Sequence, residues 1–251
     1  MVDLPSFENP PVQSVQITVA LSERLGLSDL FDFYRAGLAE SYPVMHERAA
    51  HEPTREAPWD HDGRITIDMS GVVGAPNVQL HAHSASSEWH VQLQQDWIAV
   101  TWKLIRGGAY PRWGDVRQRF SDVLTPLATK VPLRIDQADV CYRNALEQDA
   151  AADVVSMQSV AAGLGSIESL RFHSHHQVML GSSFGRMHLD IGPVKGGSIN
   201  WLGMSLTARA KPDGESIDSA LLVCDSAHVE IVKGFKAITT EKYHAIWGEQ
   251  A

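Results

Sequence analysis

Residues 89–103, WHVQLQQDWIAVTWK, alternate apolar and polar side chains on either side of the pair Gln95-Asp96. A two-residue turn at this pair places position 93 opposite 98, position 91 opposite 100 and position 89 opposite 102. One face of the hairpin is then uniformly apolar and the other is polar, and a slip of one residue would mix the two. The pattern predicts a β-hairpin that buries one face and exposes the other to solvent.

Similar strand patterns and several amphipathic helices surround this hairpin. Further strands are expected at residues 15–21, 64–69, 78–83, 133–144, 170–180, 185–193 and 200–209. Helices are expected over 28–42 with Ser28 as N-cap, over 112–127, and over a long stretch that begins near Ile217. Thr240 is expected to begin a short last helix that returns Trp247 to the core. Residues 47–63 are interpreted as a surface loop, and 146–168 as a connection with some helix.

These elements predict an α+β fold. We expect a broad curved antiparallel sheet built from two strand-rich halves, with helices packed on one face, the other face open, and a long C-terminal helix. The 251 residues fit one domain over 1–251, with halves at 1–130 and 131–251.

The composition narrows the class of protein. The chain has 21 Lys+Arg and 30 Asp+Glu, a formal charge of −9, and 44% hydrophobic residues, which excludes a disordered tail, a coiled coil and a collagen-like repeat. The negative charge argues against general binding to phosphates of nucleic acid. No signal-peptide core or membrane-length apolar segment is visible in the sequence, so a cytoplasmic protein without membrane contact is expected. The cysteines, Cys141 and Cys224, are expected to be buried free thiols.

The polar side of the predicted sheet is the first candidate site. It is rich in His, Gln and Thr, which donate and accept hydrogen bonds while carrying little fixed charge. In the second hairpin, a turn at 181–184 would place position 177 opposite 188 and position 175 opposite 190. The candidate binding face comprises His81, His83, His90, Gln92, Gln94, Thr101, His173, His175, Gln177, His188 and Asp190. Such a face fits either recognition of a ligand or partner, or an ordinary solvated surface.

Part of this face has the residue types of a metal site. His173 and His175 lie two residues apart on one strand, and a cross-strand His188 with Asp190 would complete a set of three histidines and one carboxylate. No His-Glu-x-x-His or paired Cys-x-x-Cys motif supports a metal, so no metal or other cofactor is predicted and these four residues are only candidates. The same imidazoles would alternatively form a pH-sensitive patch.

The sequence contains no glycine-rich nucleotide motif, Walker motif or Gly-x-Ser-x-Gly elbow, and no catalytic residue is assigned. Asp225 and His228 are three residues apart on the long helix. They are interpreted as an intrahelical pair that supports the helix or Trp247 rather than as an acid–base couple.

Residues 103–134 are locally basic, with seven Lys or Arg against two Asp. A solvated helix face and a docking patch for an acidic protein or nucleic acid both remain open. The candidate patch comprises Lys103, Arg106, Arg112, Arg117 and Arg119.

Short motifs spread over nearly the whole chain resemble those of a sporadically distributed bacterial protein family. Its members have about this length, and the family carries only a number because no activity has been assigned to it. The matching residues are Asn9-Pro10-Pro11-Val12, Leu93-Gln94, Thr101-Trp102-Lys103, Tyr110-Pro111, Phe120, Tyr142, Asn144, Asp225, Ala227-His228, Phe235, Thr239-Thr240, His244 and Trp247-Gly248. The family more often has Asn where Thr101 stands and Tyr where Trp113 stands. The resemblance implies no particular reaction or cofactor. A patchy distribution is typical of accessory genes such as toxin–antitoxin, immunity or anti-phage modules.

The sequence therefore favours a non-catalytic cytosolic binding or regulatory protein, antitoxin-like or defence-associated, that acts on a protein partner encoded nearby. The alternative is a small-ligand-binding protein or an enzyme that uses the His-rich face. A homodimer formed through strand edges is a third possibility.

Overall fold

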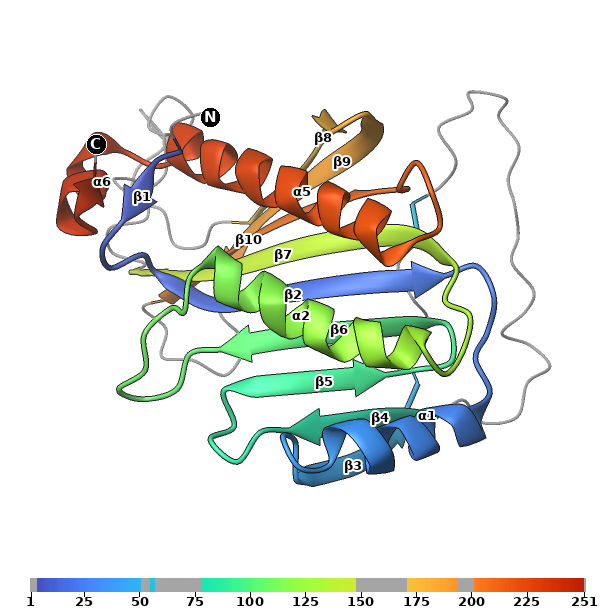
Figure 1. The fold of residues 1–251 in the computed structure, drawn as a ribbon. Coiled ribbons are helices and arrows are strands. Elements are labelled where there is room, and N and C mark those ends of the chain that lie inside the picture. The colour runs from blue at the N-terminus through green and yellow to red at the C-terminus, as the bar shows by residue number, and fades with distance from the viewer. Residues whose placement is uncertain (1–3, 51–54, 57–77, 148–170, 194–200, 251) are drawn as a thin grey trace.

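The computed structural model describes residues 4–50, 55–56, 78–147, 171–193 and 201–250, which form a nine-stranded antiparallel sheet with helices across one face (Figure 1). The strand order is β3-β4-β5-β6-β2-β7-β10-β9-β8. The strands are β2 (Val12–Leu21), β3 (Val44–Ala49), β4 (Val78–His83), β5 (Trp89–Leu93), β6 (Trp97–Lys103), β7 (Ile135–Glu147), β8 (Phe172–Leu180), β9 (Ser183–Pro193) and β10 (Trp201–Ala210). The predicted α+β fold is confirmed.

The helices are α1 (Leu27–Phe33), the π-helix η1 (Tyr34–Leu38), α2 (Trp113–Ala128), α5 (Ile217–Ile238) and α6 (Glu241–Ile246). Two short strands, β1 (Ser6–Phe7) and β11 (Glu249–Gln250), pair near the two chain ends. Of the helices in the described part of the chain, none is long and apolar enough to cross a lipid bilayer.

The predicted hairpin at 89–103 is confirmed in every paired position. In β5 and β6, Trp89 lies opposite Trp102, Val91 opposite Val100, and position 93 opposite 98. Trp102, Val91 and Val100 are almost completely buried on the face that α2 covers. The apolar faces of these two strands, set by their period-two alternation, thus form part of the core in the first half of the chain.

Strand β2 joins the two halves of the sheet. It pairs with β6 on one side and with β7 on the other, both antiparallel. Its odd-numbered residues Val15, Ile17 and Val19 are fully buried on the helical face, whereas Gln16 and Thr18 lie on the open face. The sheet therefore runs without interruption from β3 to β8.

Helix α5 covers the second half of the sheet, as predicted. Ser216 caps its first turn by accepting a hydrogen bond from the backbone N–H of Ser219. The apolar stripe packs on β7 and β10. Its buried residues are Ala220, Leu221, Val223, Cys224, Ala227, Ile231 and Phe235.

The predicted first helix differs from the structure in its start and its form. It begins at Leu27 with Gly26 rather than Ser28 as N-cap, and from Tyr34 the chain becomes π-helical. Leu30 and Phe33 are the buried residues of α1, and Tyr34 and Leu38 are those of η1.

The predicted loop at 47–63 is wrong at its start, because β3 runs to Ala49 and pairs with β4 as an edge strand. Five of its six residues are exposed and polar side chains occur on both faces, so no period-two apolar pattern marks it as a strand. The predicted strand at 64–69 lies outside the described residues, as does the predicted connection beyond residue 147.

The second predicted hairpin is correct in its strands but not in its register. Leu180 pairs with Ser183, so the turn has two residues, Gly181 and Ser182, with Gly181 at a φ of 68°. Position 177 therefore lies opposite 186, and position 175 opposite 188. Because the error is two residues, every side chain remains on its predicted face.

Candidate functional site

The open face of the sheet is hollowed at its centre. A shallow depression of about 460 Å³ lies over β2, β5, β6, β7 and β10. This polar hollow is lined by Gln16, Thr18, Ala20, His90, Gln92, Trp97, Thr101, Gln137, Asp139, Cys141, Arg143, Thr207 and Arg209. Three predicted face residues, His90, Gln92 and Thr101, line it, and the face is concave there.

Other predicted face residues are buried rather than presented to a ligand. Gln94 is 1% exposed and donates to Asp96 within the β5–β6 turn. His81 is also buried; its Nε2 lies 2.8 Å from Gln79 Oε1 and 2.9 Å from Gln92 Nε2. His81 therefore contacts neighbouring side chains within the sheet, which a period-two pattern does not reveal.

Histidines gather at one end of the polar hollow. The ring centroid of His83 lies 4.3 Å from that of His90 and 5.8 Å from that of His46. Burial lowers the pKa of His83, and the charges of His90 and His46 lower it further. Protonation of His83 beside these two rings is therefore disfavoured.

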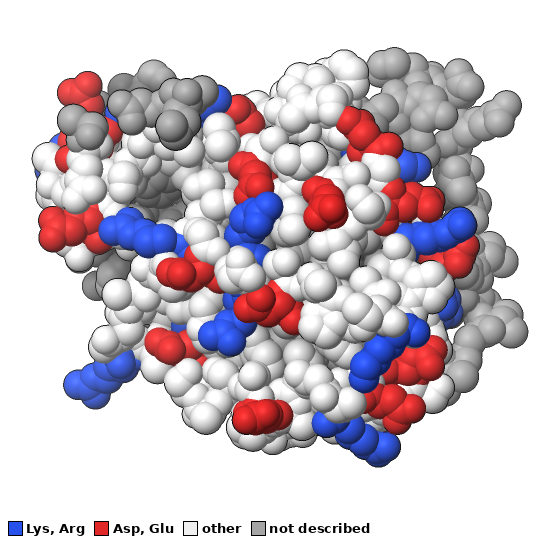
Figure 2. All heavy atoms as spheres, in the orientation of Figure 1, with Lys and Arg blue, Asp and Glu red and all other residues white. Residues whose placement is uncertain are grey.

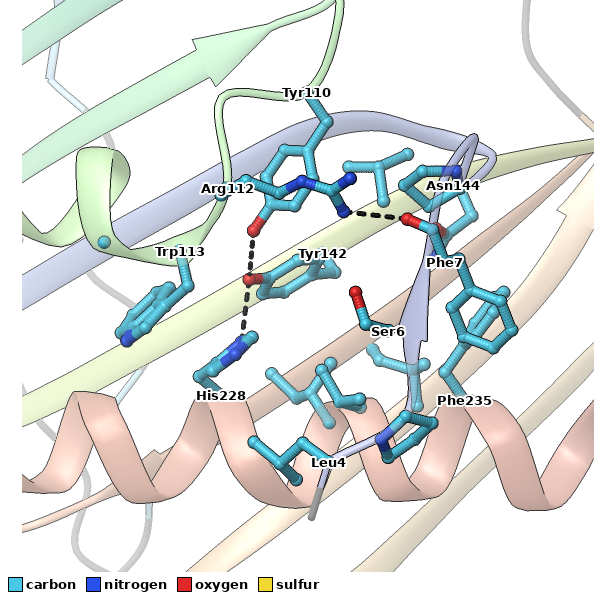
Figure 3. Close-up of a pocket in the computed structure, with 17 residues that line it drawn as sticks. Leu4, Ser6, Phe7, Tyr110, Arg112, Trp113, Tyr142, Asn144, His228 and Phe235 are labelled. Carbon is cyan, nitrogen blue, oxygen red and sulfur yellow. Dashed lines mark hydrogen bonds between the residues drawn. The ribbon is translucent and has the colours of Figure 1, made fainter. Parts of the chain in front are cut away.

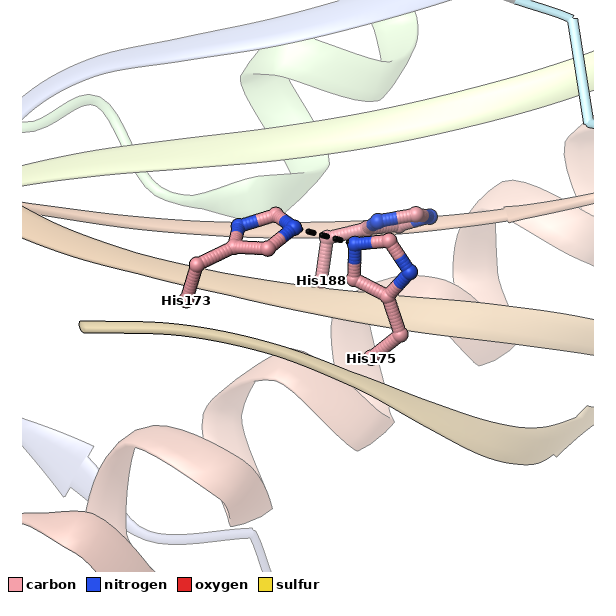
Figure 4. Close-up of side chains that lie close together, drawn as sticks. All are labelled: His173, His175 and His188. Atoms are coloured by element: carbon pink, nitrogen blue, oxygen red, sulfur yellow. Dashed lines mark hydrogen bonds between the residues drawn. The ribbon is translucent and has the colours of Figure 1, made fainter.

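A tighter group, the histidine triad of His173, His175 and His188, lies beyond the other end of the hollow on β8 and β9 (Figure 4). His175 and His188 are direct cross-strand partners, and His173 lies two residues away on the same face. Each residue offers one ring nitrogen, and these three atoms lie within 4.8 Å of one another. Three of the four predicted metal candidates, the histidines, therefore lie close enough together to share an ion.

Each end of the triad is oriented by a carboxylate. His173 Nδ1 contacts Asp190 Oδ1, and His173 Nε2 contacts His175 Nε2. His188 Nε2 lies 2.5 Å from Glu56 Oε1. Asp190 was predicted with the histidines, but Glu56 comes from the segment interpreted as a loop, and no sequence signal placed it here.

Glu56 is the centre of an ionic network beside the triad. Arg186 approaches its Oε2 at 2.7 Å and Arg209 its Oε1 at 3.3 Å. Burial opposes ionisation of Glu56, but hydrogen bonds from Arg186 and His188 hold the pKa of its carboxyl below the ordinary value. Burial and the nearby Arg209 charge lower the pKa of His188, although Glu56 opposes this. His188 is therefore kept neutral at neutral pH.

Asp139 connects this network to the polar hollow. Burial raises its pKa to about 6, while the charge of Arg209, whose Nε lies 3.6 Å away, and a hydrogen bond from Gln137 act in the opposite direction. A carboxyl of this kind gains or loses its proton close to neutral pH.

The predicted basic patch is dispersed by its contacts. Arg117 binds Asp225, Arg119 lies over the ring of Trp89, and Arg112 donates to the backbone oxygen of Phe7. On the helical side of the molecule, basic and acidic side chains alternate over the surface (Figure 2). Three of the five residues of the predicted patch thus make contacts within the protein, and a docking role for the patch stays a prediction.

A second concave site, the α2–α5 cavity, lies between the start of α2, α5, β7 and the N-terminal segment (Figure 3). Its volume is about 340 Å³. Most of the wall is apolar, with Leu4, Pro5, Phe7, Pro10, Val12, Leu206, Ile231, Val232 and Phe235. Cavities of this size and character commonly hold small molecules.

One end of the cavity carries a chain of hydrogen bonds. The Tyr110 hydroxyl lies 2.7 Å from the Tyr142 hydroxyl, which lies 2.9 Å from Nδ1 of His228. Burial raises the pKa of Tyr110 to about 12 and that of Tyr142 well above its ordinary value. Burial also lowers the pKa of His228 to about 4, against the influence of Asp225. All three groups are therefore uncharged at neutral pH.

The predicted intrahelical Asp225–His228 pair is wrong as a direct contact. Asp225 accepts hydrogen bonds from Nε of Arg117 and from Nε1 of Trp113, both at 2.9 Å. The ring of Trp113 stacks on His228 with centroids 4.7 Å apart. Asp225 thus positions Trp113, and Trp113 in turn holds the imidazole against Tyr142.

Several of the motif residues that carry the family resemblance lie at or near this cavity. Tyr110, Asn144 and His228 line it. Trp102 lies in the core with its ring 5.6 Å from that of Tyr110, Pro111 precedes α2, and Trp247 packs against Phe7. The N-terminal wall was missed, because no periodicity in residues 4–7 indicates where that segment docks.

The chain matches neither a known family model nor a curated protein sequence. The family resemblance stays a prediction.

Proposed function

We propose that this protein binds a divalent transition metal, Zn²⁺ in the first place, through His173, His175 and His188. The observation that carries the proposal is the convergence of three ring nitrogens, one from each histidine, to within 4.8 Å. Zinc bound at 2.0–2.1 Å from each nitrogen needs these atoms about 3.3 Å apart, so the proposal requires side-chain rotations that bring them to this spacing.

The surroundings of the triad support this choice. Ligating histidines usually give their other ring N–H to a carboxylate, which fixes the tautomer and the ring orientation. Asp190 takes this role for His173, and Glu56 takes it for His188. Imidazole ligands favour Zn²⁺, Cu²⁺ and Ni²⁺ over Mg²⁺ and Ca²⁺.

Three protein ligands leave a fourth position for water or a ligand. Zinc sites with three histidines are used in this open form by enzymes such as carbonic anhydrase. The rings of His173 and His175 are exposed, and Arg209 connects the site to the polar hollow, which offers room for a bound molecule. We therefore propose that the protein holds a metal ion with one open coordination position beside the polar hollow. This proposal corresponds to the alternative raised by the sequence, a small-ligand-binding protein or enzyme that uses the His-rich face.

The test is a zinc titration of protein without a histidine tag, followed by isothermal calorimetry or by competition with a chromophoric chelator. We expect one Zn²⁺ per chain for the wild type and loss of that binding in His175→Ala. Asp190→Asn should weaken binding by about 10- to 100-fold, because the orienting carboxylate is lost.

The matched control is His176→Ala. His176 is adjacent on β8 but faces the opposite side of the sheet, where it bonds to Ser174. It should leave zinc affinity unchanged. A wild type that binds no Zn²⁺, or a His175→Ala variant that binds as the wild type does, would contradict the proposal.

The protein-partner function and the homodimer remain predictions from the sequence. Pull-down with the products of neighbouring genes tests the first, and the sedimentation coefficient tests the second.

A further inference from the structure

The α2–α5 cavity has one charged residue at its rim. No Asp or Glu is among the described residues that line it, and Arg112 is the lining cation. One nitrogen of Arg112, Nη1, donates to the backbone oxygen of Phe7 at 2.7 Å. Within the described part of the chain, the guanidinium has no carboxylate in ion-pair contact.

The backbone at Arg112 is held in an unusual conformation. Its φ of 75° and ψ of 159° lie in a region that residues with side chains rarely adopt. The contact with Phe7 and the start of α2 at the next residue fix this geometry. A position of this kind costs conformational energy, and the Arg112 side chain that it carries lines the cavity.

The other polar groups that line the cavity are also compatible with a negatively charged ligand. The hydroxyls of Tyr110 and Tyr142 are protonated donors or acceptors, and Arg112 acts electrostatically on Tyr110. Trp113 and Gly114, at the N-terminus of the 16-residue helix α2, also line the cavity. The N-terminal end of a helix favours a negative group. Asp115, in the first turn of α2, acts on Tyr110 in the opposite direction to Arg112 but does not line the cavity. Among the described lining residues the charged group is therefore a cation, and most of the remaining wall is apolar.

We propose that the α2–α5 cavity binds a small anionic amphiphile, an apolar body with a single carboxylate or sulfonate head that pairs with Arg112. A cationic head would meet the Arg112 charge without a compensating acid. A neutral head would leave that charge unpaired as the cavity loses water, which lowers its affinity. This site is separate from the histidine triad and does not depend on a metal.

The experiment uses two fluorescent probes with the same ring systems, titrated into the full chain in the presence of EDTA. 8-Anilinonaphthalene-1-sulfonate carries the anionic head, and N-phenyl-1-naphthylamine lacks it. We expect saturable binding of the sulfonate at one site per chain, about tenfold tighter than that of the neutral probe.

Three variants locate the site. Arg112→Gln should weaken binding of the sulfonate by about tenfold and leave the neutral probe unchanged. Val232→Trp, which places an indole in the cavity from α5, should abolish binding of both probes. Leu222→Trp adds the same indole on the exposed face of α5, where Leu222 is 67% exposed, and should leave both unchanged.

Other results overturn the proposal. Equal affinity of the wild type for both probes would refute the proposed preference for an anionic head. An unchanged sulfonate affinity in Arg112→Gln would refute it as well. Binding that survives in Val232→Trp would show that the probe binds outside the cavity. Absence of sulfonate binding to the folded wild type would show that the cavity does not bind such a ligand. Far-UV circular dichroism of each variant verifies that the fold is intact.

Discussion

At the scale of single residues, burial decides the chemistry of His228. Its imidazole lies between Trp113 and Tyr142, and its pKa falls to about 4 from an ordinary 6.5. Between these values the unfolded chain binds a proton that the folded protein does not bind. The contribution of His228 to stability is therefore complete above pH 6.5 and is lost as the pH falls towards 4.

His228→Asn tests this linkage. Asn keeps a polar atom near the position of Nδ1 but does not titrate, so the variant should lose less stability between pH 7 and pH 4.5. We expect a difference of about 1–3 kcal/mol in that loss. Guanidinium unfolding followed by tryptophan fluorescence measures it, and parallel pH profiles for the two proteins would refute the assignment.

At the scale of elements, the close approach of β9 to its neighbours holds the triad strand in place. A Cβ at Gly185 would lie 2.7 Å from the backbone oxygen of Arg209 and 2.8 Å from Cδ1 of Leu180. The backbone oxygen cannot move without disturbing the pairing of β9 with β10. Glycine at this position therefore permits the strands to pack at their observed separation.

Gly185→Ala should lower the free energy of unfolding by about 1–3 kcal/mol, the usual range for overpacking. Gly192→Ala on the same strand is the control, because its Cβ would meet nothing closer than Arg171 Cγ at 3.9 Å. The control should change stability by less than about 0.5 kcal/mol. Urea unfolding of both variants gives the comparison, and equal losses would show that the crowding at Gly185 has no energetic consequence.

At the scale of the whole molecule, the sheet makes the predicted halves interdependent. Removal of residues 1–130 would leave β7 without β2 and α5 without α2. We expect the full chain to unfold in one transition, with the same midpoint by far-UV circular dichroism and by tryptophan fluorescence. Two separated transitions, or a folded fragment of residues 131–251, would contradict this expectation.

The sequence predicted which face of the sheet each strand residue points to better than it predicted the cross-strand register and the elements with no apolar period. Period-two alternation assigned His173, His175 and His188 to one face, and an error of two residues in the register left that assignment intact. Edge strand β3 and the π-turn at Tyr34 were missed, since an exposed polar strand has no apolar period and a π-turn breaks the regular one.

The sequence by itself determined the apolar faces of the paired strands, because apolar periodicity is a local property that survives small errors in register. It also determined that the second half would end in a long helix with a defined buried stripe. Only the tertiary structure decided which groups meet: Glu56 at His188, Trp113 on His228, and the N-terminal segment against α5. These contacts join residues far apart in the chain, and their energies depend on packing and burial rather than on any local pattern.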